Sequence, residues 1–187
     1  MDAECALRDG LAEGYSVRLL GPTDLEAYLA HLSRLDGPAR ALRFSAGVDD
    51  HFLLSHCLSR ILSSCILVGG FAQGTLRGAV EIDMDDELME GEPGLSVEKP
   101  YRRKGLGGAM LRLAIAEARA AGAGALRFDV ERGNTAMIKL VEGCGATPVG
   151  KGNTRTYRLI LNARPVATTV PRPSFFARLL ARPARVA

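Results

Sequence analysis

The chain has 187 residues, of which 47% are hydrophobic and 24% charged, values typical of a single globular domain. Aromatic residues make up only 5% and tryptophan is absent, which argues against a base-stacking surface for single-stranded nucleic acid. The formal net charge of +3 depends on five arginines after position 163, where no acidic residue occurs, so the rest of the chain gives no electrostatic reason to expect a nucleic-acid partner.

Cysteine usage and the N-terminus point to a reducing compartment. The four cysteines, Cys5, Cys57, Cys65 and Cys144, do not have the paired spacing of a disulfide framework. The N-terminus is acidic and lacks the layout of a signal peptide. No apolar run approaches the ~20 residues that a membrane-spanning helix needs. We therefore predict a cytoplasmic protein with reduced thiols and no membrane span.

Two helices are expected before the first strand. Thr23 and Glu26 have the spacing of a capping box, and leucines then recur at helical spacing until Gly37-Pro38 ends the pattern. A second amphipathic helix is expected from Asp49 or Asp50 to Ile61.

Strands and helices alternate in the rest of the chain. In order we expect a hairpin of strands at 65–68 and 76–82, an acidic connection at 83–90, a strand at 95–97, a helix at 109–121, a strand at 125–130, a helix at 134–141 and a strand at 156–161. This α-α-β-β-β-α-β-α-β order predicts a mixed α/β domain at 17–162. An N-terminal extension at 1–16 and a loosely ordered tail rich in proline and arginine at 163–187 flank it.

A basic, glycine-rich loop at 102–108 lies between a predicted strand and a predicted helix. Backbone N–H groups at such a position can bind phosphate, and the helix N-terminus favours negative charge. The dinucleotide-binding pattern requires a third glycine where Met110 stands, and the Gly-Lys-Ser/Thr of a P-loop does not occur, so both nucleotide motifs are excluded. A plain turn that uses glycine for its backbone freedom is the structural alternative.

Two motifs together resemble the GNAT superfamily of N-acyltransferases. Arg102, Gly105 and Gly107 match its acyl-CoA signature, Arg/Gln-x-x-Gly-x-Gly/Ala, and the segment from Asn134 to Gly145-Ala146 matches its second motif. The resemblance covers residues 17–161. It implies a mixed, mostly antiparallel central sheet flanked by helices, with strands that splay around an acyl-CoA site. It also implies transfer of an acetyl group from acetyl-CoA, without a metal, to a primary amine by direct attack.

The resemblance further implies which residues bind acetyl-CoA. The backbone of Val97 and Lys99 would pair with the pantetheine arm, and the Val97 N–H would lie near the thioester oxygen. Asn134 has two possible roles, contact with the CoA arm or the capping of its helix. The pyrophosphate would lie on the loop that Arg102 precedes, on the N–H groups of Arg103, Lys104, Gly105, Leu106, Gly107 and Gly108.

The reaction also requires a neutral amine, so a carboxylate that accepts a proton is expected near the thioester. Glu92 lies five residues before Val97, at the place where similar members carry their catalytic glutamate. Glu81 on the preceding strand is the second candidate and Glu98 the third, and each has the alternative of a solvated surface carboxylate. The family's usual tyrosine, which protonates the leaving thiolate, is replaced by Val141; Tyr157, Tyr101 and water are the alternatives.

The remaining polar residues give weaker predictions. His51 and His56 are five apart, and with His31 they do not form a metal site. Arginines at 34, 40 and 43, together with Lys151 and Arg155 before the last strand, predict a basic rim. Such a rim suits a small amine that carries an acid group, with a protein lysine as the next candidate acceptor. The acidic run near Asp83 instead favours a basic protein segment as the acceptor. A catalytically silent CoA-binding sensor or interaction module is the alternative function, and the protein is expected to be a monomer or homodimer.

Overall fold

The structure is a computed structural model that describes residues 11, 13–44, 47–85, 89–150 and 154–161. Its helices are α2 (Leu25–Ser33), α3 (Gly37–Phe44), α4 (Asp50–Leu62), α5 (Leu106–Ala120) and α6 (Thr135–Gly143), with short 3-10 turns η1 (Pro22–Asp24) and η2 (Lys99–Tyr101). Its strands are β1 (Tyr15–Leu19), β2 (Ile66–Ala72), β3 (Thr75–Asp85), β4 (Glu90–Val97), β5 (Ala125–Glu131), β6 (Thr147–Val149) and β7 (Thr154–Ile160). The predicted tail at 163–187 lies outside the described residues, and β1 begins two residues before the predicted domain start.

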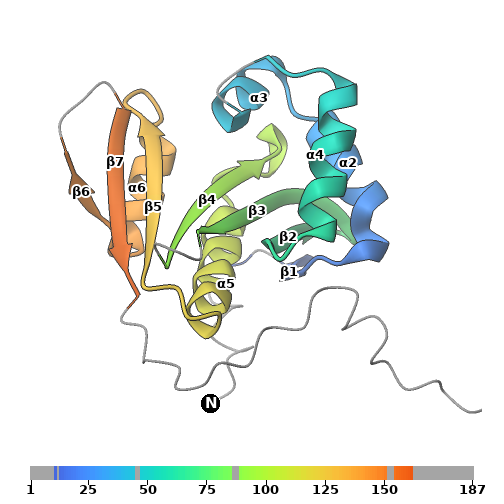
Figure 1. The fold of residues 1–187 in the computed structure, drawn as a ribbon. Coiled ribbons are helices and arrows are strands. Elements are labelled where there is room, and N and C mark those ends of the chain that lie inside the picture. The colour runs from blue at the N-terminus through green and yellow to red at the C-terminus, as the bar shows by residue number, and fades with distance from the viewer. Residues whose placement is uncertain (1–10, 12, 45–46, 86–88, 151–153, 162–187) are drawn as a thin grey trace, which may run out of the picture.

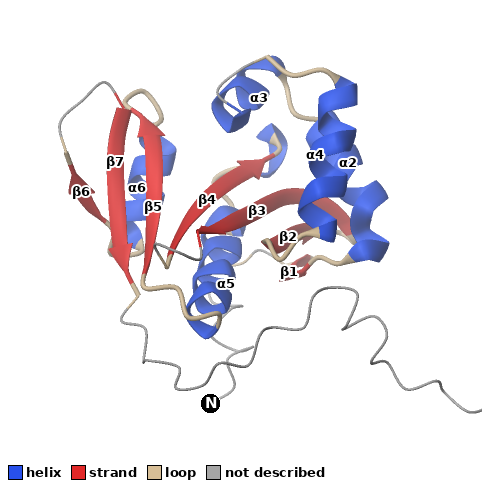
Figure 2. Cartoon of the chain, in the orientation of Figure 1, coloured by secondary structure: helices blue, strands red, loops and turns tan. Residues whose placement is uncertain are grey.

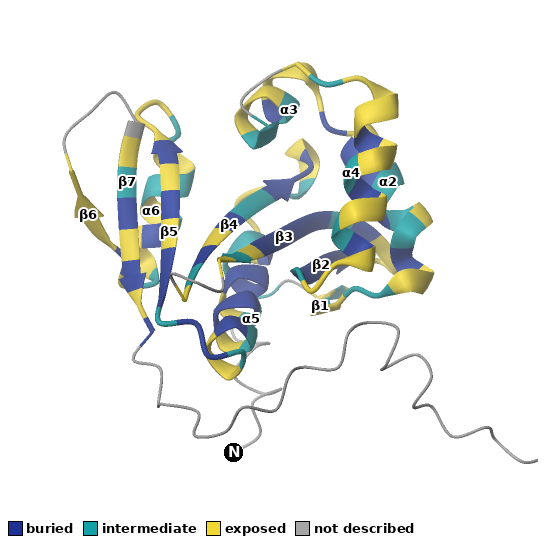
Figure 3. Ribbon diagram, in the orientation of Figure 1, coloured by how far each residue is buried: buried dark blue, intermediate teal, exposed yellow. Residues whose placement is uncertain are grey.

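The strands form one seven-stranded sheet in the order β1-β2-β3-β4-β5-β7-β6, in which every neighbouring pair is antiparallel except β4 and β5 (Figures 1 and 2). Helices α5 and α6 lie on one face, where an apolar cluster includes Met110 and Leu126. Helices α2 and α4 cover the other face through a second cluster that includes Leu32 and Leu53. Burial is concentrated where helices meet the sheet (Figure 3). The sheet with helices on both faces confirms the predicted mixed, mostly antiparallel α/β fold.

Several elements differ from the sequence prediction, and the reasons are local. The capping box at Thr23 and Glu26 does not form; instead the Asp24 carboxylate accepts the Gly21 N–H at 2.9 Å and pairs with Arg18. Gly37-Pro38 begins α3 rather than ending a helix, because proline is tolerated in the first turn and the Asp36 carboxylate caps the Ala39 N–H at 2.8 Å. The strand predicted at 95–97 is longer, β4 beginning at Glu90, because Gly91, Pro93 and Gly94 have low strand propensity and hide its first half from sequence analysis.

The sheet opens between β4 and β5. Their parallel pairing is confined to Glu90 with Ala125 and Gly91 with Leu126, after which the two strands diverge (Figure 1). Strand β4 stays paired with β3 along its whole length, and β5 stays paired with β7. The splayed strands implied by the family resemblance are therefore confirmed.

Helix α5 starts close beneath the sheet because β2 carries glycine at the contact. A Cβ atom at Gly70 would lie 2.8 Å from Leu106 Cδ1 and 2.6 Å from Met110 Sδ, closer than real Cβ atoms approach. This glycine lets the first turn of α5 pack directly on β2. The start of α5 is thereby held beside the opening between β4 and β5.

Candidate functional site

A cleft of about 1580 Å³ fills the space where β4 and β5 separate. Its walls come from β3, β4 and β5, from α3 and α4 on one side, and from the starts of α5 and α6 on the other. One end of the cleft lies at the glycine-rich loop and the other at a network of charged side chains. The two ends differ in charge and in chemistry.

The glycine-rich loop presents the N-terminus of α5 to the cleft. Gly105 is the N-cap, and its φ of 82° lies in the left-handed region that favours glycine. The N–H groups of the first helical turn, from Leu106 to Gly108, have no partner within the helix and carry the positive end of its dipole. The Leu106 side chain is only 1% exposed and anchors the loop in the core, so the position of these N–H groups is fixed.

Gly107 leaves room for a ligand between β4 and α6. A Cβ atom there would lie 3.8 Å from both Val97 Cγ2 and Leu140 Cδ2, which is ordinary contact distance, so any longer side chain would extend across this gap. Cationic side chains surround this end of the cleft: Arg102, Arg103, Arg112 and Lys139. Bare N–H groups, positive charge and the space beside Gly107 fit the pyrophosphate and arm of acetyl-CoA.

The open edge of β4 carries backbone groups that face the gap. The Glu98 N–H donates to the Arg77 carbonyl at 2.9 Å, so by antiparallel alternation the next pair, Val97 and Gly78, exchanges no hydrogen bonds. The backbone groups of Val97, and of Leu95 two residues earlier, point away from β3 toward the splay. The Val97 carbonyl also accepts a hydrogen bond from Arg102 Nε at 2.8 Å, which ties the strand to the loop.

Most of the predicted cofactor residues come together here. The cleft is lined by Val97, Arg102, Arg103, Gly105, Gly107, Gly108 and Asn134. Lys99 and Lys104 are exposed outside its lining, and the Lys104 ammonium lies 5.8 Å from the centre of the Tyr101 ring. Asn134 caps α6, because its side chain accepts the Met137 N–H at 3.1 Å.

The candidate general acids lie away from the cleft. Val141, at the usual tyrosine position, is fully buried in the core. The Tyr157 hydroxyl donates to Glu142 at 3.1 Å, and Tyr101 packs beside Arg77; neither tyrosine is among the lining residues.

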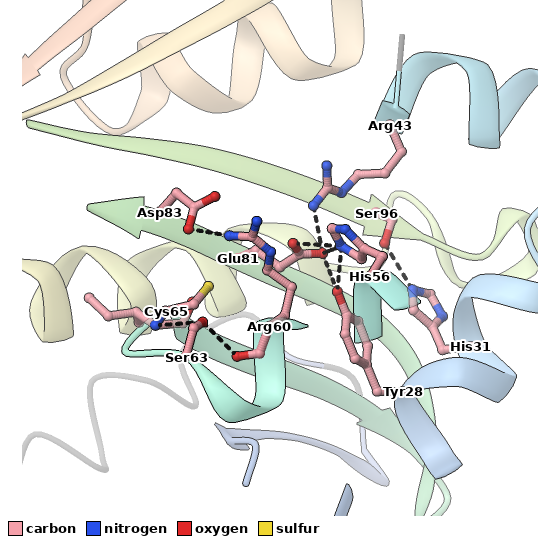
Figure 4. A network of polar contacts seen from close by, with 11 residues as sticks. Tyr28, His31, Arg43, His56, Arg60, Ser63, Cys65, Glu81, Asp83 and Ser96 are labelled. Carbon is pink, nitrogen blue, oxygen red and sulfur yellow. Dashed lines mark hydrogen bonds and ion pairs between the residues drawn. The ribbon is translucent and has the colours of Figure 1, made fainter. Parts of the chain in front are cut away.

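Glu81 lies at the centre of the charged end (Figure 4). This carboxylate is 5% exposed and accepts hydrogen bonds from the Tyr28 hydroxyl and from His56 Nε2, the latter at 2.9 Å. Arg43 forms an ion pair with it at 2.5 Å. Burial alone would raise the pKa of Glu81, but the hydrogen bond from His56 and the charge of Arg43 outweigh it and lower the pKa to about 2.

A glycine on the neighbouring strand makes the Arg43 contact possible. Gly94 lies directly opposite Glu81 in the β3–β4 register. A Cβ atom at Gly94 would lie 2.5 Å from Arg43 Cζ, so the guanidinium occupies the space that a side chain would take. Arg43 therefore reaches from α3 over β4 to Glu81.

The other two candidate carboxylates lie in different surroundings. Glu92 also lines the cleft, but its side chain is 59% exposed and pairs with Arg127 on β5 at 3.0 Å. Glu98 is buried outside the cleft lining in a second network, with His31 at 3.1 Å, Arg34 at 2.9 Å and Arg77 at 3.0 Å. The fold thus brings Glu81 and Glu92 to one cleft and leaves Glu98, which directly follows β4, outside its lining.

Sequence reasoning missed Tyr28 and His56 as members of this site. It considered His56 only as a metal ligand, and nothing in the local sequence links α2, α4 and β3. Among the described residues, no group of three or more His, Cys, Asp or Glu side chains could hold a metal ion. None of the helices in the described part of the chain is long and apolar enough to cross a membrane.

Comparison with known proteins agrees with the geometry. The sequence model of the Acetyltransferase (GNAT) family matches residues 36–146, more than half of the chain. The chain belongs to this family. No curated protein shows a significant sequence match.

Solved structures share the GNAT fold at low sequence identity. A putative acetyltransferase, yncA, from Salmonella typhimurium with its cofactor acetyl-CoA has 19% identity and a TM-score of 0.64, over 84% of this chain and 100% of that one. Ribosomal-protein-alanine N-acetyltransferase from Brucella melitensis has 20% identity and a TM-score of 0.62, over 78% and 99%. The paia N-acetyltransferase from Thermoplasma acidophilum in complex with coenzyme A has 18% identity and a TM-score of 0.60, over 78% and 98%.

The lowered pKa of Glu81 predicts how stability depends on acidity. A carboxyl group whose pKa falls on folding stabilises the protein above its unfolded pKa, and this stability is lost as the pH falls toward the folded value. We expect the Tm of the wild type to fall between about pH 4.5 and pH 2, and Glu81→Gln to show a flatter decline. Calorimetry across this range checks the prediction, with exposed Glu92→Gln as the control. Equal slopes for Glu81→Gln and the wild type would contradict it.

Proposed function

We propose that the protein is an N-acetyltransferase that moves an acetyl group from acetyl-CoA to a primary amine by direct attack within the cleft. The observation that carries this proposal is one continuous cleft, with an anion-binding helix N-terminus at one end and a buried carboxylate network at the other. Neighbours of the same fold in complex with acetyl-CoA or coenzyme A support the same donor.

The residues that would hold acetyl-CoA follow from the cleft. The N–H groups of the loop from Arg103 to Gly108 would bind the pyrophosphate, with Arg102 adding positive charge. The open backbone of β4 at Val97, continued by Lys99, would pair with the amides of the pantetheine arm, and Asn134 would contact the arm from α6. Acetyl-CoA supplies the activated thioester carbonyl, and a backbone N–H of β4 would stabilise the negative charge that develops on its oxygen.

The amine nitrogen attacks the carbonyl carbon as the neutral amine. A C–N bond forms, the C–S bond breaks, and its electron pair leaves on the sulfur. The acceptor enters as an ammonium ion, because the pKa of a lysine-like amine is ~10.4, and it gives up two protons. One ends on the CoA thiol and the other passes to solvent, so a group in the cleft that takes up the first proton accelerates the reaction.

The charges of the acceptor end favour a cationic amine over an amine that carries an acid group. Three arginines expected to form a basic rim each pair with a carboxylate: Arg34 with Glu98, Arg40 with Asp50 and Arg43 with Glu81. Of the other two residues of that predicted rim, Lys151 lies outside the described residues and Arg155 does not line the cleft. Glu131 adds negative charge to the cleft from β5, whereas Asp129 pairs with Arg127 at 3.4 Å. A polyamine or a protein lysine therefore ranks ahead of an acid-bearing amine as the acceptor.

We also propose that the protein acts in the cytoplasm, as a monomer or homodimer.

An assay of thiol release from acetyl-CoA tests the function. The panel contains spermidine, a lysine-containing basic peptide and free amino acids, and we expect release with at least one of the first two. Binding of acetyl-CoA without release on any amine would instead favour a catalytically silent CoA-binding sensor or interaction module.

Gly107→Asp tests the acetyl-CoA site. The side chain would fill the space between β4 and α6 and place a negative charge beside the N-terminus of α5, so we expect calorimetric affinity for acetyl-CoA to fall by ~10²-fold or more. Because the added Cβ makes only ordinary contacts, the fold should persist. Gly37→Asp adds the same charge where no atom lies within 4 Å and serves as the control. Unchanged affinity in Gly107→Asp would exclude this location.

Paired substitutions test which carboxylate assists the transfer. We propose Glu81, because it is buried at the cleft and held in place by residues of three helices, whereas Glu92 is exposed at the rim. Glu81→Gln should lower kcat by ~10²-fold or more at neutral pH. Glu92→Gln should change the rate by less than ~10-fold, mainly through KM for a cationic amine, as expected for an exposed ion pair. Acetyl-CoA affinity should be retained in both variants, and the reverse ranking would assign the role to Glu92.

A further inference from the structure

His56 is fixed in the cleft by aromatic side chains and by Glu81. Its ring stacks on Phe52 with centroids 5.9 Å apart and an interplanar angle of 16°, and it meets the edge of Phe44 at 5.1 Å. Its Nε2 lies 2.9 Å from Glu81 Oε2. The side chain is nevertheless 13% exposed and belongs to the cleft wall. Figure 4 shows the ring beside Glu81 and Tyr28, and these contacts hold it in one orientation at the cleft wall.

The hydrogen bond to Glu81 determines which ring nitrogen can accept a proton. An ionised carboxylate only accepts hydrogen bonds, so Nε2 of His56 carries the hydrogen and donates it. In the neutral ring the lone pair is then on Nδ1. A carboxylate that orients an imidazole and stabilises its protonated form is the arrangement on which histidine bases depend.

Glu81 itself is poorly suited to take the proton. Its pKa of about 2 is far below neutral, and efficient general bases have pKa values near the working pH. Its oxygens are also occupied by Tyr28, His56 and Arg43. Glu81 can therefore assist only through a group that it holds, and among its partners a neutral imidazole is the one able to gain a proton.

The other histidines do not share this placement, although all three lie in the described residues. His31 is fully buried outside the cleft lining, and both ring nitrogens are used, by Glu98 at 3.1 Å and by Ser96 at 2.9 Å. His51, five residues before His56 on α4, is exposed and does not line the cleft.

We propose that His56 accepts the proton of the acceptor amine, and that Glu81 and Tyr28 are positioning residues that hold its ring. This inference rests on the proposed function and deepens it. A proton passes from the ammonium nitrogen to Nδ1 of His56, which leaves the neutral amine to attack and an imidazolium paired with Glu81. The imidazolium then returns its proton to solvent, so the net reaction is unchanged.

The charged groups around the ring come from three elements, and a fourth contributes a hydroxyl. Glu81 and Asp83 are on β3, Arg43 is on α3 and Arg60 is on α4. Tyr28 on α2 contributes a hydroxyl 3.4 Å from Nε2. Both arginines are themselves paired, Arg43 with Glu81 and Arg60 with Asp83.

The experiment compares His56→Gln with His51→Gln, a matched change on the same helix, using the amine that gives the fastest thiol release. Glutamine can still donate to Glu81 but cannot take up a proton. We expect kcat of His56→Gln to fall by ~10²-fold at neutral pH, and the ionisation on the acidic side of the wild-type pH–rate profile to disappear. His51→Gln should keep both the rate and the profile.

A second variant separates a chemical role from a structural one. His56→Ala should lose activity to a similar extent and regain part of it when free imidazole is added, whereas Glu92→Gln should not respond to imidazole. Calorimetric binding of acetyl-CoA should be the same in the wild type and in all of these variants.

The outcomes distinguish the inference from the function on which it rests. A wild type that releases no thiol with any amine contradicts both. An active wild type whose pH profile is retained in His56→Gln, or a His56→Ala variant that imidazole does not rescue, contradicts the role of His56 while leaving acetyl transfer in place.

Discussion

The functional site depends on the early end of the pairing between β4 and β5. Backbone N–H and C=O groups removed from water must find partners, and beyond Gly91 the outer edge of β4 pairs with no strand in the part of the chain that the structure describes. Val97 and Leu95 therefore present backbone groups to a cleft rather than to a sheet. An extended ligand with its own amides would satisfy them in the way that a strand does, which is the pairing that we propose for the pantetheine arm.

Charge divides the same cleft into two regions. Around the start of α5, helix N–H groups and arginines such as Arg102 and Arg103 favour an anion. At the other end the arginines are paired, because Arg43 is held by Glu81 and Arg60 by Asp83, so they do not repel a cation. Under the proposed function this polarity would orient the two reactants, with the phosphates at one end and an ammonium group at the other.

The parts of the site that sequence could predict are those built from neighbouring residues. The loop at 102–108 is local, and its position between a strand and a helix followed from short-range patterns. The contacts of Glu81 could not be predicted, because Tyr28, Arg43 and His56 come from three separate helices that meet only after packing on the sheet. The same holds for the arginines of the acceptor end: their number was visible in the sequence, but their pairing with carboxylates was not.

The buried carboxylate also links the acceptor end to the packing of the helices. An ionised group that is 5% exposed is stable only while its partners stay in place, and removing one partner leaves an uncompensated charge. Because α2, α3 and α4 each supply one partner, a shift of any one helix weakens the hydrogen bonds or ion pair that fix the other two at Glu81. The geometry of His56 is thus set by the arrangement of all three helices. An acceptor that reshaped this end would have to move them together rather than displace a single side chain.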